Sequence, residues 1–113
     1  MDFKKSTAEK EDAGCDIVAM ANKNGGVVYF GVKPNGAIVG CPNGDKEIRE
    51  LANFFSGNIE PALPLEITGE EVDGKGVIKI VIPKSETPFH TFKQRFYLRV
   101  GTETQARGLQ AEY

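Results

Sequence analysis

The stretch Gly25–Gly40 constrains the fold of this chain more than any other part of the sequence. It places two glycines directly before an apolar run, a third inside that run, and a fourth after an asparagine in the next turn. The double glycine predicts the left-handed end of a preceding helix, and the apolar run Val27–Val32 predicts a central strand covered on both faces. Asn35-Gly36 favours a tight hairpin turn, with residues 37–39 as the returning strand.

The other periodicities of the sequence complete an α+β pattern. We expect one domain over residues 1–113, either a small protein or a domain of a longer one, with a mixed sheet of about six strands packed with two main helices. A short C-terminal helix follows, because Thr102-Glu103-Thr104-Gln105 matches a capping box. The predicted order β-α-β-β-α-β-β-β has an edge strand at 2–6, a helix at 8–22, strands at 27–32 and 37–39, a helix at 45–59 capped by Asp45, and strands at 63–68, 77–82 and 95–100.

Composition excludes several classes of protein. No apolar run approaches the roughly 20 residues that a membrane-spanning helix needs, and no charged-then-apolar leader opens the sequence, so we expect a cytoplasmic protein without membrane contact. Cys15 and Cys41 lack a C-x-x-C spacing, and His90 is the only histidine. We therefore expect reduced thiols, no cofactor, no metal site and no Ser/His/Asp catalytic set.

The strand at 95–100 carries the most suggestive polar side chains. Strand alternation predicts that Phe96, Leu98 and Val100 point inward and that Arg95, Tyr97 and Arg99 share the opposite face. Arginine forks suit phosphate oxygens, and a tyrosine between them can stack on an unpaired base. The alternative is an amphipathic strand whose charged side simply faces water. The candidate nucleic-acid-binding residues are Arg95, Tyr97, Arg99, Lys93, Lys4 and Lys5.

The net charge of −2 argues against a strongly basic binding surface, although the ends of the chain are mildly basic. Residues 83–113 carry five basic and three acidic side chains. With so few cations, binding to nucleic acid is expected to be modest and strongly dependent on salt.

Six short motifs in order carry a family resemblance. They are Asp2-Phe3-Lys4-Lys5-Ser6, Ala21-Asn22-Lys23-Asn24-Gly25-Gly26, Phe30-Gly31-Val32 through Gly36 to Gly40, Ile59-Glu60-Pro61, Val81-Ile82-Pro83 and Tyr97-Leu98-Arg99-Val100-Gly101-Thr102. Together they resemble the Schlafen-type AlbA-like domain, a DNA-binding module of bacterial and archaeal transcriptional regulators. The resemblance implies a non-catalytic module that binds nucleic acid, with DNA favoured over RNA. We expect a structural role for Asn22, Gly25, Gly26, Gly31, Gly36 and Gly101.

The same resemblance raises a metal-dependent ribonuclease as an alternative. Animal Schlafen relatives cleave structured RNA with three carboxylates, which can hold a divalent ion. Asp2 matches one of them, a second falls before Met1, and the third position is taken by Lys33, Pro34 and Asn35. The carboxylate set is incomplete, so we expect no catalysis.

Two further alternatives are nucleotide binding and protein interaction. Gly26 and Gly31 have the spacing of a phosphate loop, but Val32 stands where the lysine belongs, and the residues between them are strand-like. We therefore expect no nucleotide site. Relatives that pair two such lobes imply a homodimer, and an interaction or dimerisation module without its own ligand remains the alternative to nucleic-acid binding.

Overall fold

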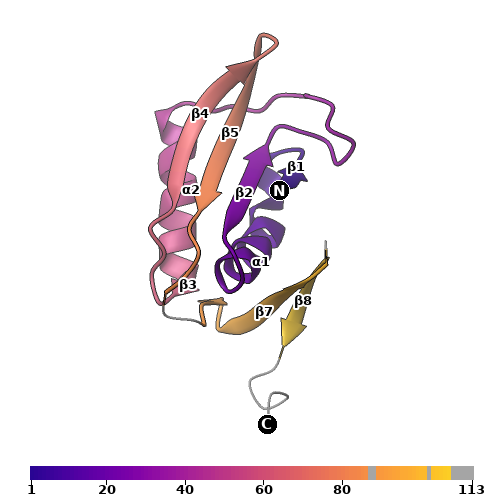
Figure 1. The fold of residues 1–113 in the computed structure, drawn as a ribbon. Coiled ribbons are helices and arrows are strands. Elements are labelled where there is room, and N and C mark those ends of the chain that lie inside the picture. Colours follow the sequence, from indigo (N-terminus) through magenta and orange to yellow (C-terminus); the bar gives the residue numbers. More distant parts are fainter. Residues whose placement is uncertain (87–88, 102, 108–113) are drawn as a thin grey trace.

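The computed structural model describes residues 1–86, 89–101 and 103–107 and confirms a single α+β domain with two main helices (Figure 1). In chain order the elements are β1 (Asp2–Lys4), the 3-10 helix η1 (Thr7–Glu9), α1 (Lys10–Ala21), β2 (Gly26–Phe30), α2 (Asp45–Asn58), β3 (Ile59–Glu60), β4 (Glu66–Val72), β5 (Lys75–Ile82), β6 (Thr91–Phe92), β7 (Arg95–Val100) and β8 (Glu103–Arg107). Within this described part of the chain, no helix is long and apolar enough to cross a membrane.

The strands form two sheets, so the predicted single sheet of about six strands is wrong. The first sheet has the order β1-β2-β5-β4, with β1 parallel to β2 and the other pairs antiparallel. The second sheet, β3-β6-β7-β8, is antiparallel throughout. The N-terminal edge strand is confirmed, and the mixed sheet holds four strands.

Helix α1 lies between the two sheets, which explains its sequence. It packs on β2 and β5 of the first sheet and on β7 of the second. Eight of its twelve residues are buried, as expected for a helix that is covered on more than one side. Gly14 lies where α1 meets the second sheet, because a Cβ there would be 2.2 Å from a ring carbon of Phe92.

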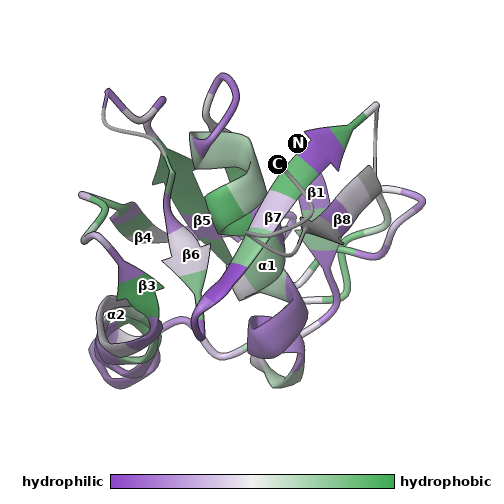
Figure 2. Cartoon of the chain, turned by 90° about the horizontal axis from the view of Figure 1, so that it is seen from below, coloured by the Kyte–Doolittle hydropathy of each residue, from purple (hydrophilic) through white to green (hydrophobic). Residues whose placement is uncertain are grey.

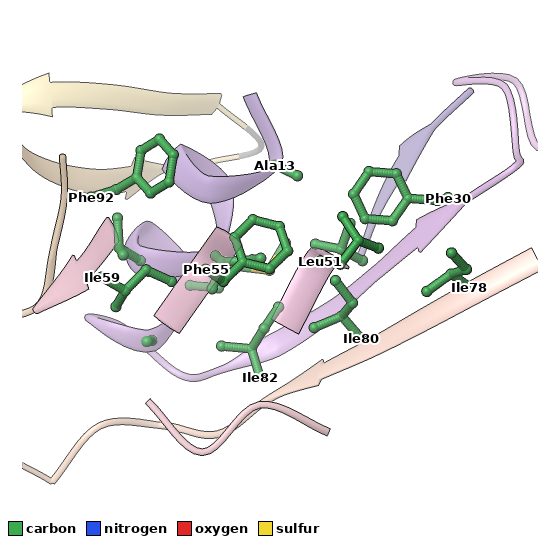
Figure 3. Close-up of a cluster of buried hydrophobic side chains, with 14 residues drawn as sticks. Ala13, Phe30, Leu51, Phe55, Ile59, Ile78, Ile80, Ile82 and Phe92 are labelled. Carbon is green, nitrogen blue, oxygen red and sulfur yellow. The ribbon is translucent and has the colours of Figure 1, made fainter. Parts of the chain in front are cut away.

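Helix α2 covers the first sheet beside α1 and is amphipathic. It buries Leu51 and Phe55 against the isoleucines of β5, as Figure 3 shows. In Figure 2, β5 is coloured mostly hydrophobic and α2 mostly hydrophilic. The helix begins at Asp45, the residue expected to be its cap, because the N-cap is Gly44, whose N–H donates to the Glu47 carboxylate at 3.0 Å.

The hairpin predicted after β2 is reduced to one bridge, between Val32 and Ile38. Only Gly36 of the Asn35-Gly36 pair is left-handed, with φ +90°. Pro34 explains this difference, because its fixed φ suits the first central position of a type I turn. The turn therefore centres on Pro34 and Asn35, with the Gly36 N–H bonded to the Lys33 carbonyl at 2.8 Å.

The predicted C-terminal helix is also wrong. Residues 103–107 form β8, which pairs antiparallel with β7, and Thr102 itself lies outside the described residues. A capping-box pattern does not distinguish a helix start from a turn between two strands, and pairing with β7 decides here. The β4–β5 hairpin is confirmed: Asp73 and Gly74 both have positive φ, 52° and 76°, as a two-residue hairpin turn requires.

Candidate nucleic-acid interface

The face of β7 that carries Tyr97 and Arg99 turns toward α1, not toward water. Tyr97 packs against the hydrophobic core, and the Arg99 side chain is only 12% exposed. Val100, expected to point inward, is 47% exposed. The prediction holds for Phe96, which is buried, and fails for Arg99 and Val100. Strand alternation says which residues share a face, but carboxylates on other elements decide whether an arginine can be covered.

Arg99 belongs to a cluster of four charged side chains, which we call the ion cluster: Asp2, Lys4, Asp16 and Arg99. The guanidinium of Arg99 donates to both carboxylate oxygens of Asp2, at 2.7 and 2.8 Å, and lies 3.5 Å from Asp16. Lys4 Nζ is 2.7 Å from the other oxygen of Asp16. Two cations face two carboxylates, so the cluster has no net charge with which to attract phosphate.

The ion cluster shifts the pKa values of Asp2, Arg99 and Lys4. Burial alone would raise the pKa of Asp2, but the hydrogen bonds and charge of Arg99 outweigh it and hold that pKa below its usual 3.8. The hydrogen bond to Asp2 raises the pKa of Arg99. Burial would lower the pKa of Lys4, but contact with Asp16 raises it. All three groups are charged at neutral pH.

Tyr97 sits against Cys15 of α1. Burial, together with the hydrogen bond to the Cys15 thiol, raises the pKa of Tyr97 to about 12. Burial also raises the pKa of Cys15, so its thiol stays protonated at neutral pH and is a poor nucleophile. Tyr97 is therefore a half-buried side chain that packs against the core and bonds to Cys15 through its hydroxyl group, and it is not the freely exposed ring that the sequence suggested.

The remaining predicted cations of the second sheet lie at the turn between β6 and β7. We call residues Lys93, Gln94 and Arg95 the basic turn. Arg95 is exposed and, among the described residues, has no ion-pair partner. Lys93 pairs with Glu11 of α1 and lies 5.5 Å from the ring centre of Phe54.

Lys10, which was not among the predicted residues, joins the basic turn. Its Nζ lies 4.6 Å from the ring centre of Phe54, so Lys10 and Lys93 share one aromatic ring. The acidic side chains Glu47 and Glu50 line the hollow beside Lys10. No sequence signal links Lys10 to Lys93, because only the packing of α1 against α2 and β6 brings them together. Lys5 is exposed and lies apart from this group, directly after β1.

Two residues in left-handed conformations shape the basic turn. Lys93 and Gln94 have φ of 51° and 67°, a conformation that costs a non-glycine residue about 1–2 kcal/mol. The Lys93 N–H donates to the carbonyl of Asn58 at the end of α2, at 2.8 Å. The turn is thus held against α2, with its side chains outward.

Asn22 is the polar residue that ties the second sheet to α1. Its side chain accepts from the His90 N–H at 2.7 Å and donates to the carbonyls of His90 and Tyr97, at 3.0 and 3.3 Å. His90 is buried, with its ring nitrogens 2.7 Å from the Pro61 carbonyl and 2.6 Å from the Ser85 hydroxyl. The structural duty assigned to Asn22 thus has a physical basis.

The described residues contain no group of three His, Cys, Asp or Glu side chains placed to hold a metal ion. Both oxygens of Asp2, the one matched carboxylate, accept from Arg99. Lys33 is exposed in the turn after β2.

Comparison with known proteins identifies the family. The model of the family "Schlafen, AlbA_2" matches residues 1–107, and this chain belongs to that family. A search of the curated proteins found no match.

Two solved structures share the fold. The DIP2311 protein from Corynebacterium diphtheriae aligns over 94% of this chain with a TM-score of 0.74 and 20% identity, and the N-terminal domain of a RecG-related protein from Nitrosomonas europaea aligns over 75% with a TM-score of 0.59 and 24% identity. This chain spans 21% of the first protein and 62% of the second.

Proposed function

We propose that this chain is a non-catalytic nucleic-acid-binding module, directed to DNA, that serves a prokaryotic transcriptional regulator in the cytoplasm as a homodimer. Membership of the Schlafen, AlbA_2 family supports the proposal. The fold is also that of the N-terminal domain of a protein related to RecG, an ATP-dependent DNA helicase. The observation that carries the proposal is the exposed basic turn, where Lys93 and Arg95 project beside Lys10.

The exposure of their ion pairs distinguishes Lys93 from Arg99 among the predicted contact residues. The pair of Lys93 with Glu11 has side chains 44% and 56% exposed, and such a pair contributes only about 0–1 kcal/mol. A phosphate can replace Glu11 at little cost. The pair of Arg99 with Asp2 has side chains 12% and 19% exposed, and breaking it would strand a charge in a poorly solvated place. We therefore place the contacts at the basic turn, with Lys5 as a further contact.

Affinity in this proposal is modest. Glu11 pairs with Lys93, and Glu47 and Glu50 line the hollow beside Lys10, so these carboxylates reduce the local positive potential. Each phosphate contact adds about one unit to the dependence of log K on log salt. An interface with three cations should therefore bind at low salt and release the nucleic acid near physiological ionic strength.

The test compares two triple variants with the same loss of charge. In the first, Lys10, Lys93 and Arg95 are replaced by alanine; in the matched control, Lys33, Lys46 and Arg49 are replaced by alanine. Fluorescence anisotropy with a labelled DNA duplex at low salt measures binding, and the RNA duplex of the same sequence tests the preference for DNA. We expect the first variant to lose binding and the control to keep most of it.

Equal losses in the two variants would mean that overall charge, and not the basic turn, attracts DNA. A wild-type protein that binds neither duplex would overturn the proposed function. The non-catalytic part of the proposal has its own test: a folded RNA should remain intact when incubated with the protein and Mg²⁺.

A further inference from the structure

One face of the first sheet carries no helix among the described residues. Both helices pack on the face with Val28 and Ile80, and the second sheet lies beyond α1. Figure 1 looks onto the opposite face, with α2 behind β4. We call this opposite side the outer face. Its central residues are Phe3, Val27, Tyr29, Glu66, Lys79 and Val81, of which Glu66 is exposed and the others half-buried, and the exposed Glu70 and Lys75 lie on the same side nearer the β4–β5 turn.

The register arranges these side chains in two rows across the strands. In the first row, Phe3 of β1 is opposite Tyr29 of β2, and Tyr29 is opposite Lys79 of β5. The rings of Phe3 and Tyr29 lie 6.1 Å apart. In the second row, Val27 is opposite Val81, and Val81 is opposite Glu66 at the edge of the sheet. The outer face therefore has an aromatic and aliphatic centre with one cation and one anion.

We propose that the outer face is the surface through which two copies of this chain pair, face to face, about a two-fold axis that runs parallel to the strands between β2 and β5. The inference rests on the homodimer of the proposed function and does not depend on nucleic-acid binding. It names the residues that make that homodimer.

The order of the strands makes this pairing self-complementary. The axis reverses β1-β2-β5-β4 in the second copy, so that β2 lies over the partner's β5. Tyr29 then lies over the partner's Lys79, and the same contact occurs a second time by symmetry. An ammonium over a tyrosine ring is attractive. Lys79 has no ion pair among the described residues, so its charge is available for this contact.

The second row supports the same arrangement. Val27 lies over the partner's Val81, which removes aliphatic surface from water at the centre of the interface. The charges of the outer face, Lys75 and Lys79 against Glu66 and Glu70, sum to zero, so two copies do not repel each other.

Charge favours a second copy over a nucleic acid as the occupant of the outer face. Glu66 and Glu70 alternate with Thr68 along the same side of β4, and both are exposed. Lys75 and Lys79 lie on that same side of β5, so a phosphate backbone lying across the sheet would meet two carboxylates and two lysines, with no net positive charge to attract it. A second copy meets a face of balanced charge.

The size of the outer face sets the strength of the pairing. Four strands about 4.8 Å apart and five residues long, at about 3.4 Å per residue, cover roughly 300 Å². Stable interfaces bury about 800 Å² on each partner. The dimer should therefore be weak and depend on concentration, as interfaces at the small, transient end of the range do.

A single tryptophan can report on this face, because the natural sequence contains none. We would replace Tyr29 by Trp and, as a control, Val100 by Trp in a separate variant. Over about 10 µM to 1 mM, concentrations at which weak complexes form, emission from Trp at position 29 should shift to shorter wavelength as dimers form. Emission from Trp at position 100 should not change with concentration.

A second pair of variants tests the contact by disruption. Val81→Lys places a charge at the centre of the outer face, whereas Val100→Lys adds the same charge elsewhere. Analytical ultracentrifugation should show that Val81→Lys weakens the dimer at least tenfold and that Val100→Lys leaves it unchanged. Circular dichroism checks that both variants are folded; if Val81→Lys does not fold, the tryptophan experiment decides alone.

Three results would overturn the inference. The first is a wild-type protein that remains monomeric at about 1 mM, the weak end of the affinity scale. The second is a dimer in which Trp at position 29 does not respond. The third is a Trp at position 29 that responds to a thymidine oligomer while the protein is monomeric. The last result would make the outer face a nucleic-acid surface. None of them bears on the duplex binding of the basic turn, so the two proposals can fail separately.

Discussion

Arg99 of β7 and Asp2 of β1 are joined by two parallel hydrogen bonds of 2.7 and 2.8 Å, although 97 residues separate them in the chain. The contact connects the edge of the first sheet to the second sheet across the middle of α1, where Asp16 lies 3.5 Å from the Arg99 guanidinium. The two sheets have no strand in common. This ion pair is therefore one of the few polar links that fix their relative position.

We expect Asp2→Asn to destabilise the protein by about 1–3 kcal/mol, the usual contribution of a hydrogen bond to a charged group. The amide keeps the shape of the carboxylate but loses its charge and one of its two acceptors. Urea unfolding at pH 7 measures the loss. Asp73→Asn in the exposed β4–β5 turn is the matched control and should change the free energy of unfolding by less than about 0.5 kcal/mol.

The same variant makes a prediction about pH. The pKa of Asp2 is lower in the folded protein than its usual 3.8, so the unfolded chain takes up the proton first as pH falls. The stabilisation by the Asp2–Arg99 pair is complete at pH values above 3.8 and is lost as the pH falls from there through the lower pKa of the folded protein. The difference in the free energy of unfolding between wild type and Asp2→Asn should stay constant near neutral pH and shrink in the acid range. A difference that does not change between pH 7 and pH 3 would contradict this account.

The elements predicted correctly from the sequence are those specified by neighbouring residues. Asp73-Gly74 determines the β4–β5 hairpin because both residues tolerate positive φ, and Gly25 ends α1 with φ +79°. The errors arise where distant partners decide. β2 pairs with β5 and β1 instead of the residues that follow it, and β8 forms because β7 offers it an edge.

The candidate site was predictable only in part, for the same reason. Alternation correctly placed Tyr97 and Arg99 on one face of a strand, but no local pattern shows that Asp2 and Asp16 would cover that face. The basic turn was found through Lys93 and Arg95, whereas Lys10 is added by the packing of α1 alone. Whether these residues bind nucleic acid stays a prediction.

Two helical glycines should respond in opposite ways to alanine. Alanine gains about 1 kcal/mol of helix propensity over glycine. At Gly57 in α2, nothing lies within 4 Å of the new Cβ, so Gly57→Ala should stabilise the protein by about 0.5–1 kcal/mol. At Gly14 the Cβ would overlap the buried ring of Phe92, and overpacking costs about 1–3 kcal/mol. Gly14→Ala should therefore destabilise the protein. A melting temperature that rises for both variants would refute the close approach of Gly14 to the Phe92 ring.

Asn22→Ala should be among the most damaging single substitutions in the chain. It removes three hydrogen bonds and leaves the N–H of the buried residue His90 without its partner. We expect a loss of about 2–4 kcal/mol. Asn24→Ala, in the exposed turn two residues later, is the control and should change stability by less than about 0.5 kcal/mol. Hydrogen exchange should also show faster exchange at the His90 amide, and an unchanged rate there would argue against the Asn22 contact.

Gln94→Gly should stabilise the protein, because Gln94 has a left-handed φ of 67°, which glycine adopts without strain. Relief of the left-handed conformation gains about 1–2 kcal/mol, and the greater entropy of glycine in the unfolded chain offsets part of it. We expect a net gain of about 0.5–1 kcal/mol in urea unfolding. Asn35→Gly, in a turn where the left-handed residue is already Gly36, should destabilise the protein. If Gln94→Gly also weakens DNA binding while Lys93 and Arg95 are intact, the strained conformation itself aims those cations; unchanged binding would show that charge alone is sufficient.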